Sequence, residues 1–288
     1  MSELLYAAKQ GNYAVAAPNV FSDVTVRAVF EIADQLKAPI ILNCVGAHGI
    51  ENVAAITRFY AQKHPAVTYA LNLDHGGDFE EIMLALRNGF SSVMIDRSQL
   101  CFDDNIREVK EVVKIAYAMN VSVEAELGHV GQGFEYEATR NAGLTNVDEA
   151  VVFVKETNVD CLAVAIGTSH GVYKGTPKLE FDLLQQLRNA IQIPLVLHGA
   201  SGTGDDLLQK AVRLGIQKIN LFTDLSNAGL KSELEYMGID FDSFKKDGSL
   251  GEFGNKSLNM FDAAEAAAAG YQKALAHYMR LFGSENKA

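Results

Sequence analysis

Short apolar runs alternate along the chain with longer stretches in which apolar residues recur every three or four positions. Continuous apolar runs are typical of strands buried on both faces, and the longer period is typical of helices that pack on one side. The predicted strands are 13–19, 39–44, 67–73, 91–96, 121–127, 160–166, 194–198 and 217–221. The predicted helices between them are 24–37, 50–62, 79–88, 104–119, 147–157, 181–190 and 205–214.

Residues that commonly begin or end helices stand at several of these boundaries. Ser22, Asp78 and Asp103 precede the first, third and fourth helices, where a side-chain oxygen can accept a hydrogen bond from a free backbone N–H. Gly89 and Gly215 follow predicted helices, where a residue in the left-handed conformation commonly ends the helix. These signals support a division of the chain into repeated strand–helix units.

The repeated unit indicates an α/β fold with a parallel sheet. Eight units in 288 residues favour a closed (β/α)₈ TIM barrel that forms a single domain over residues 1–288. Two smaller domains also fit the length, and a doubly wound open sheet also fits the alternation. The open sheet is disfavoured because no G-x-G-x-x-G motif follows the first strand and because polar residues end many different strands.

Three segments lie outside the repeat. Residues 128–145 form a long glycine-containing loop, and such a loop in a compact domain is usually functional. Residues 231–258 are predicted to be a polar excursion after the last strand. Residues 259–283 are predicted to form an additional C-terminal helix that packs outside the barrel or against another subunit.

Composition and charge restrict the classes of partner. The chain is 48% hydrophobic and 21% charged, as in ordinary globular proteins, and its net charge is −11. This acidic balance argues against nucleic acid and against an anionic membrane surface as the main partner. Because no signal peptide or membrane-spanning run is evident, and Cys44, Cys101 and Cys161 form no C-x-x-C motif, we expect a reducing, cytoplasmic location.

Polar side chains collect where the predicted strands end. Active sites of TIM barrels lie at the carboxyl ends of the strands, so these residues should share one rim. They are Asp74 and His75 (third strand), Glu124 and Glu126 (fifth), His170 (after the sixth), His198 (seventh) and Asn220 (eighth).

Three imidazoles at one rim indicate a zinc site with an open position for substrate. His75, His170 and His198 are far apart in sequence, which suits a site assembled from several strands. Glu126 could be a further ligand or could hold a ligand imidazole from behind. The alternative is that each histidine is a hydrogen-bonded rim residue without metal. For the other histidines (His48, His64, His129 and His277) an ordinary structural role is expected.

The loops after the last two strands indicate a phosphate site. The sequences HGASG (198–202) and NLFTD (220–224) offer backbone N–H groups and the hydroxyls of Ser201 and Thr223. These loops hold phosphate in many TIM barrels, and backbone donors at a helix N-terminus bind anions without net positive charge. Lys174 could add one cation. The alternative is that Gly199 and Gly202 only make tight turns.

Five motifs together resemble the class II, metal-dependent ketose-bisphosphate aldolases, of the fructose- and tagatose-bisphosphate type. They are NLDHGGD (72–78), VEAELGHVG (123–131), AVAIGTSHG (163–171), PLVLHGASG (194–202) and KINLFTD (218–224). The resemblance implies one Zn²⁺ per subunit on His75, His170 and His198, with Glu126 as a ligand in an alternative metal position. It also implies that Asp74 is the catalytic acid/base.

Further roles follow from the same resemblance. Glu135, or next Glu137, in the long loop would move the C1 proton. Backbone carbonyls near Ser169, Gly171 and Gly199 would hold a monovalent cation, Na⁺ or K⁺, as in some members. The predicted substrate-binding residues are Asn19, Gly171, Lys174, Gly199, Ala200, Ser201, Asn220, Leu221, Phe222 and Thr223. A homodimer or homotetramer is expected.

The expected reaction is reversible cleavage of a ketose bisphosphate to dihydroxyacetone phosphate and an aldehyde. Phe222 stands where many fructose-bisphosphate enzymes have Asp, and the loop sequence QGFEYE also departs from the family pattern. A different phosphorylated ketose, such as a monophosphate, deoxy or acidic sugar, therefore stays open, as does a non-catalytic sugar-phosphate-binding partner subunit. A Schiff-base mechanism on Lys218 is disfavoured because this lysine lies below the rim.

Overall fold

Eight parallel strands form the centre of the molecule. The structure is a computed structural model that describes residues 1–131, 133, 141–171, 173, 177–240, 246 and 259–288. The strands follow the order β1-β8-β7-β6-β5-β4-β3-β2, and the edges β1 and β2 meet through a parallel bridge between Asn19 and Asn43. The strands are β1 (Val15–Pro18), β2 (Ile40–Cys44), β3 (Tyr69–Gly76), β4 (Ser92–Ile95), β5 (Ser122–Leu127), β6 (Cys161–Val164), β7 (Leu195–Leu197) and β8 (Ile216–Leu221).

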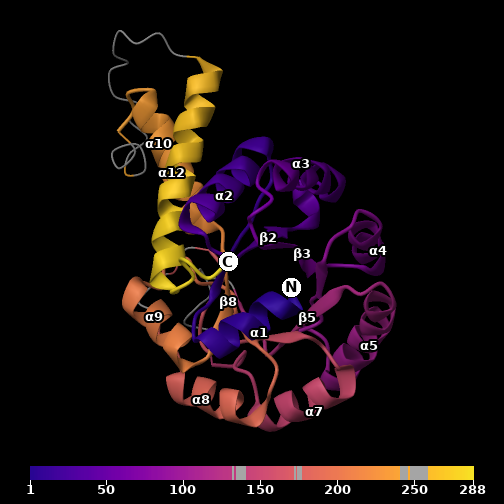
Figure 1. The fold of residues 1–288 in the computed structure, drawn as a ribbon. Coiled ribbons are helices and arrows are strands. Elements are labelled where there is room, and N and C mark those ends of the chain that lie inside the picture. The colour runs from indigo at the N-terminus through magenta and orange to yellow at the C-terminus, as the bar shows by residue number, and fades with distance from the viewer. Residues whose placement is uncertain (132, 134–140, 172, 174–176, 241–245, 247–258) are drawn as a thin grey trace.

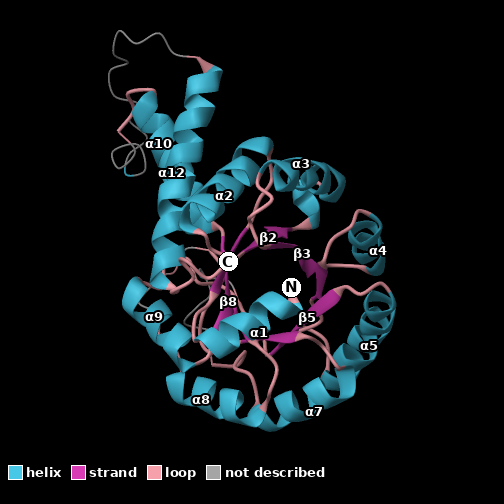
Figure 2. Cartoon of the chain, viewed as in Figure 1, coloured by secondary structure: helices cyan, strands magenta, loops and turns pink. Residues whose placement is uncertain are grey.

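Helices surround the barrel in the order that the repeat predicts (Figures 1 and 2). Those of the strand–helix units are α2 (Asp23–Leu36), α3 (Ile50–Lys63), α4 (Phe79–Arg87), α5 (Phe102–Ala118), α7 (Val147–Thr157), α8 (Phe181–Ala190) and α9 (Asp205–Leu214). A short 3₁₀ helix, η1 (Gly46–His48), precedes α3. The predicted TIM barrel is confirmed. Among the described residues, none of the helices combines the length and apolar character needed to cross a bilayer.

Most of the predicted helix boundaries are correct. Ser22 caps α2 in a capping box with Thr25, and the Asp78 side chain accepts a hydrogen bond from the Glu81 N–H at the start of α4. Gly215 ends α9 with φ 115°, in the left-handed region that glycine adopts without strain. The cap predicted at Asp103 is wrong: Cys101 holds that position and Asp103 lies in the first turn of α5.

Two apolar clusters stabilise the barrel. The larger cluster lies between the strands and the surrounding helices. The smaller cluster fills the interior of the barrel near the amino ends of the strands, with side chains such as Ile41, Ala163 and Val196. The N-terminal helix α1 (Ser2–Gly11), which the sequence pattern did not predict, contributes Leu5 and Ala8 to the interior cluster. In Figure 1, α1 lies across the end of the barrel. The opposite, carboxyl end of the strands is therefore the open one.

Two helices extend beyond the barrel as a pair. The helices α10 (Thr223–Tyr236) and α12 (Met260–Leu281) run side by side away from the barrel in Figure 1. The predicted C-terminal helix corresponds to α12. The predicted polar excursion 231–258 begins within α10, which continues to Tyr236, and residues 241–245 and 247–258 of it lie outside the described residues. Gly270 packs so closely on α10 that a Cβ there would lie 2.4 Å from the Ala228 carbonyl oxygen.

Candidate active site

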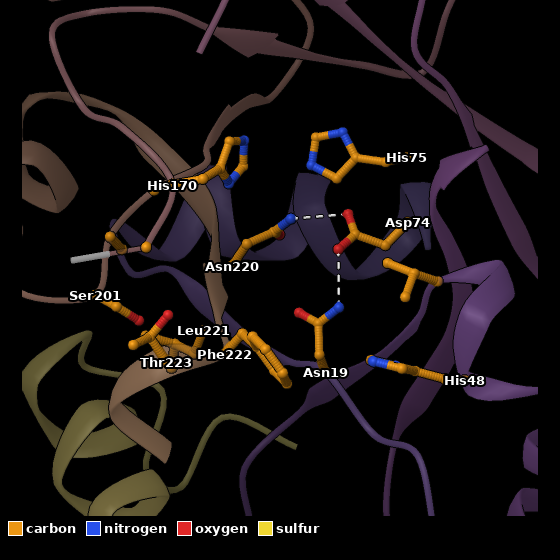
Figure 3. Close-up of a pocket in the computed structure, with 14 residues that line it drawn as sticks. Asn19, His48, Asp74, His75, His170, Ser201, Asn220, Leu221, Phe222 and Thr223 are labelled. Carbon is orange, nitrogen blue, oxygen red and sulfur yellow. Dashed lines mark hydrogen bonds between the residues drawn. The ribbon is translucent and has the colours of Figure 1, made fainter. Parts of the chain in front are cut away.

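A pocket of about 330 Å³ opens at the carboxyl ends of the strands (Figure 3). It contains every predicted substrate-binding residue that the structure describes, together with Asp74, His75 and His170. These substrate-binding residues are Asn19, Gly171, Gly199, Ala200, Ser201, Asn220, Leu221, Phe222 and Thr223. Lys174 lies outside the described residues. The remaining lining residues are Val45 and His48.

The three predicted zinc ligands converge at the inner end of this pocket. One nitrogen of each imidazole of His75, His170 and His198 lies within 4.8 Å of the other two. The Nε2 atom of His75 lies 3.0 Å from the Nδ1 atom of His198. Burial, together with the charges of His198 and His75, lowers the pKa of His170 to about 3. His170 is therefore a neutral imidazole at neutral pH, which is the form that binds metal.

A fully buried ion pair lies behind His198, and we call Glu124, His198 and Lys218 the charged floor. The Nε2 atom of His198 lies 2.8 Å from Glu124 Oε1, and Lys218 Nζ donates to Glu124 Oε2 at 2.6 Å. Although burial acts to raise the pKa of Glu124, Lys218 and His198 hold it below its usual value. The Glu124 carboxylate can thus accept the Nε2–H of His198, and this leaves Nδ1 as the ligand atom.

Two carboxylates contact His75 and define a second cluster of ligand atoms. Asp96 follows β4, and its Oδ2 atom lies 2.9 Å from His75 Nδ1. His75, Asp96 and Glu126 each offer one possible ligand atom, and these three atoms lie within 4.8 Å of one another. Burial alone would lower the pKa of His75, but Asp74, Asp96 and Glu126 raise it to about 9. Asp96 was not identified from the sequence, although it ends the predicted strand 91–96 and so carries the same signal as Asp74.

The donor set fits a zinc ion. Tetrahedral Zn–N bonds of about 2.0–2.1 Å place ligand atoms about 3.4 Å apart, and the 3.0 Å between His75 Nε2 and His198 Nδ1 is close to that separation. Glu126 is buried, and its Oε2 atom has no hydrogen-bond partner among the described residues while lying 3.7 Å from His198 Nδ1. A buried carboxylate oxygen without a partner is costly, and a nearby cation would satisfy it.

Asp74 lies next to the imidazoles and is held by two amides (Figure 3). Asn19 Nδ2 donates to Asp74 Oδ2 at 3.0 Å, and Asn220 Nδ2 donates to Oδ1 at 2.9 Å. Burial acts to raise the pKa of Asp74, but His75, His198, Lys218 and the Asn19 hydrogen bond together lower it below its usual value. The carboxylate is therefore ionised and fixed in orientation at the pocket wall.

The loops after β6, β7 and β8 present backbone groups to one side of the pocket. Gly171, Gly199 and Gly202 have φ values of 79°, 66° and 75°, which residues other than glycine rarely adopt. A Cβ atom at Gly199 would lie 2.5 Å from the Ser169 carbonyl oxygen, so this close approach requires glycine. Thr223 begins α10, whose first N–H groups have no partners within the helix, and the Asp224 N–H donates to Ser201 Oγ at 3.3 Å.

Some predicted residues have other positions. Glu135 and Glu137 lie outside the described residues. His129 contacts Ser98 and stays outside the three-imidazole cluster, and His64 and His277 bond to surface carboxylates. His48, to which the sequence assigned no role, lines the pocket instead. His48 lies in the loop after the predicted strand 39–44 and not at the strand end. Its place in the sequence therefore does not show whether its side chain faces the pocket.

The arrangement can be compared with known proteins. A family model described as fructose-bisphosphate aldolase class-II matches residues 1–287. The chain belongs to this family. It is therefore an aldolase, a carbon–carbon lyase of the metal-dependent class, as the five motifs predicted.

Solved aldolase structures share this fold. The YdjI aldolase from Escherichia coli K12 is 31% identical, with a TM-score of 0.83 over 100% of this chain and 98% of that chain. The fructose-bisphosphate aldolase from Campylobacter jejuni is 20% identical, with a TM-score of 0.81 over 99% of this chain and 95% of that chain. At this lower identity the likeness concerns the fold alone.

Proposed function

We propose that this class II aldolase uses one zinc ion per subunit to cleave a phosphorylated ketose reversibly into dihydroxyacetone phosphate and an aldehyde. The observation that carries the proposal is the convergence of His75, His170 and His198, with ligand atoms within 4.8 Å of one another, beside the buried carboxylate of Asp74. When bound by these imidazoles, with Glu126 as the alternative ligand, zinc would supply Lewis acidity that polarises the ketose carbonyl.

Asp74 is the proposed acid/base. During cleavage it takes the proton of the C4 hydroxyl while the C3–C4 bond breaks and the electron pair stays on C3. During synthesis it returns that proton to the new hydroxyl oxygen. The hydrogen bonds from Asn19 and Asn220 support this role because they fix both carboxylate oxygens. C3 of the ketose, which becomes C1 of dihydroxyacetone phosphate, takes up a proton from a second carrier, and Glu135 remains the prediction for that step.

The glycine-rich side of the pocket is the proposed site for the phosphate of dihydroxyacetone phosphate. Positive-φ glycines at 171 and 199, the Ser201 and Thr223 hydroxyls and the start of α10 support anion binding by backbone donors. Asn220 uses its Nδ2 group on Asp74, and its Oδ1 atom has no partner among the described residues. Asn220 therefore supports the site mainly by fixing the Asp74 carboxylate.

The substrates left open are a ketose bisphosphate and another phosphorylated ketose, such as a monophosphate, deoxy or acidic sugar, and the bisphosphate and the monophosphate differ in the aldehyde half. A ketose bisphosphate of the fructose or tagatose type carries a second phosphate there, whereas a ketose monophosphate does not. Further parts of the proposal are a Na⁺ or K⁺ ion near the Ser169 and Gly199 carbonyls, a homodimer or homotetramer, and a cytoplasmic location. The exposed apolar side chains of Met260 and Phe261 on α12 are consistent with a subunit contact.

The test is a coupled assay for dihydroxyacetone phosphate released from a panel of ketose phosphates. We expect cleavage by the zinc-loaded protein, its loss in excess chelator and its return with zinc. Asp74→Asn should lower kcat by about 10²–10⁴-fold while zinc content stays the same. Asp34→Asn, at a surface carboxylate paired with His64, is the matched control. Full activity in excess chelator would refute the proposal.

A further inference from the structure

His48 and Phe222 line the mouth of the pocket, Phe21 packs against both of them from outside the lining, and we call these three residues the aromatic rim. Their ring centroids lie 5.5 Å (Phe21–His48), 6.4 Å (Phe21–Phe222) and 5.8 Å (His48–Phe222) apart. They follow the neighbouring strands β1, β2 and β8. Phe21 is 41% exposed and Phe222 44% exposed. Aromatic rings that contact one another and stay open to solvent at a pocket mouth provide a ready surface for a ligand.

The rim lies on the aldehyde side of the pocket. Figure 3 shows Ser201 and Thr223 on one side, the Asp74 carboxylate and His48 toward the other, and Phe222 and Asn19 between them. In the proposed reaction, Asp74 contacts the hydroxyl on the carbon where the aldehyde half begins. With the phosphate on the Ser201 side and the C4 hydroxyl at Asp74, we infer that the aldehyde half lies along Asn19 and His48, with Phe222 beside it.

His48 presents a neutral edge to this side. Burial lowers the pKa of His48, and its hydrogen bond to the Val20 backbone and the Asp74 charge counteract this lowering. The Nδ1 atom is buried and has no hydrogen-bond partner among the described residues. The ring is therefore held neutral, and the aromatic rim carries no positive charge on this side of the pocket.

We propose that the aromatic rim selects a short, uncharged 2-hydroxyaldehyde that ends in an apolar carbon, such as a methyl group, over an aldehyde that ends in phosphate. This inference rests on the proposed aldolase function and specifies its substrate class as a ketose 1-phosphate of the 6-deoxy type. The Phe222 ring covers the terminal carbon, and the neutral His48 ring beside it extends this apolar surface.

The physical basis is the different cost of placing a methyl or a phosphate group on the rim. Contact between a methyl group and the rings removes apolar surface from water, which is favourable. A phosphate would lose hydration and face ring surfaces that carry partial negative charge, near the Asp74 carboxylate. Among the lining residues that the structure describes, no Lys or Arg side chain is present to compensate that charge.

The experiment measures synthesis by the zinc-loaded enzyme with dihydroxyacetone phosphate and three aldehydes. These are lactaldehyde, glyceraldehyde and glyceraldehyde 3-phosphate, each tested as both enantiomers. We expect kcat/KM to be highest for lactaldehyde and at least about tenfold higher than for glyceraldehyde 3-phosphate, a preference of the size expected for one apolar group. A higher kcat/KM for glyceraldehyde 3-phosphate would overturn the inference.

Variants at position 222 assign the preference to the rim. Phe222→Ala should lower kcat/KM for lactaldehyde more than for the other aldehydes and so remove most of the roughly tenfold preference for lactaldehyde over glyceraldehyde 3-phosphate. Phe222→Arg should raise kcat/KM for glyceraldehyde 3-phosphate. Phe59→Ala is the matched control, because this phenylalanine is 51% exposed on α3 and does not line the pocket. An equal loss with all aldehydes in Phe222→Ala would show that the rim is not selective.

A half-reaction separates this inference from the proposed function. Deuterium exchange into dihydroxyacetone phosphate, followed by NMR without any aldehyde, depends on the zinc-bound site and not on the rim. Absence of exchange in the zinc-loaded enzyme would reject the proposed function itself. Normal exchange together with a preference for the phosphorylated aldehyde would reject the role of the rim alone.

Discussion

The charged floor and the aromatic rim lie in the same site but are built in different ways. Glu124, His198 and Lys218 are fully buried and bonded to one another, whereas Phe21 and Phe222 retain almost half of their exposure. A change in the floor leaves a charge without a partner inside the barrel, and a change in the rim alters only a surface open to water. The fold and the chemistry therefore depend on the floor, and the choice of substrate can vary at the rim.

Loss of a floor imidazole should have the largest effect. His198→Ala removes one of three predicted zinc ligands, so we expect zinc affinity to fall at least about a thousandfold and cleavage to disappear. His277→Ala is the control, because this exposed histidine bonds to Asp205 outside the pocket. Titration with a fluorescent zinc chelator measures both; unchanged zinc affinity in His198→Ala would contradict the assignment.

The ion pair behind His198 should have the next largest effect. Lys218→Met leaves the buried Glu124 carboxylate without its cation, so the free energy of unfolding should fall by about 3–5 kcal/mol. Lys218→Met with Glu124→Leu should recover part of that stability yet lower zinc affinity by about 10–100-fold, because His198 loses its orienting carboxylate.

Denaturant titrations of the apo-proteins, with zinc titrations of the same variants, check this prediction. Lys110→Met breaks an exposed ion pair with Glu156 and should cost less than about 1 kcal/mol. If the double variant kept the zinc affinity of the wild-type protein, the orienting role of Glu124 would be wrong.

The sequence predicted the floor and the rim to different extents. His198 of the floor, like His75 and His170, could be predicted because each follows an apolar strand. The carboxyl ends of barrel strands all lie at the same end of the barrel. The role of Lys218 could not be predicted, because it depends on a contact with Glu124 from another strand, whereas Asp96 was overlooked although it ends the predicted strand 91–96. The helix α1 was missed because its short amphipathic run resembles a loop start, and α10 because its apolar period is weak.

The rim was predicted least well. Phe222 was identified only by a resemblance, as a departure from a common residue, and Phe21 and His48 follow two other strands. Contact among the three rings depends on how the loops after β1, β2 and β8 pack, and no single segment carries that information. Aromatic residues in loops are also common without any function, so their presence alone indicates little.

The rim should contribute little to stability. Phe222→Ala removes a ring that is 44% exposed, so we expect the free energy of unfolding to change by less than about 1 kcal/mol. Comparison with Lys218→Met in the same denaturant titration tests whether the rim is separable from the fold. A loss as large as that in Lys218→Met would show that Phe222 is part of the core.

The pH dependence of stability should show the smallest effect. The pKa of His48 in the folded protein lies below its usual value of 6.5, so the unfolded chain binds more protons below that pH. The contribution of His48 is present above pH 6.5 and is lost as the pH falls. The apo-protein of His48→Phe should therefore lose less stability than wild type between about pH 7 and pH 5, as measured by urea unfolding. An identical loss would indicate that His48 is not held neutral.

The most direct test of the central claim is anomalous X-ray scattering at the zinc edge from a crystal of the zinc-loaded protein. The account predicts one strong peak within bonding distance of His75 Nε2, His198 Nδ1 and a ring nitrogen of His170. A peak that none of these imidazoles contacts, or no peak in a protein that still cleaves its substrate, would contradict it.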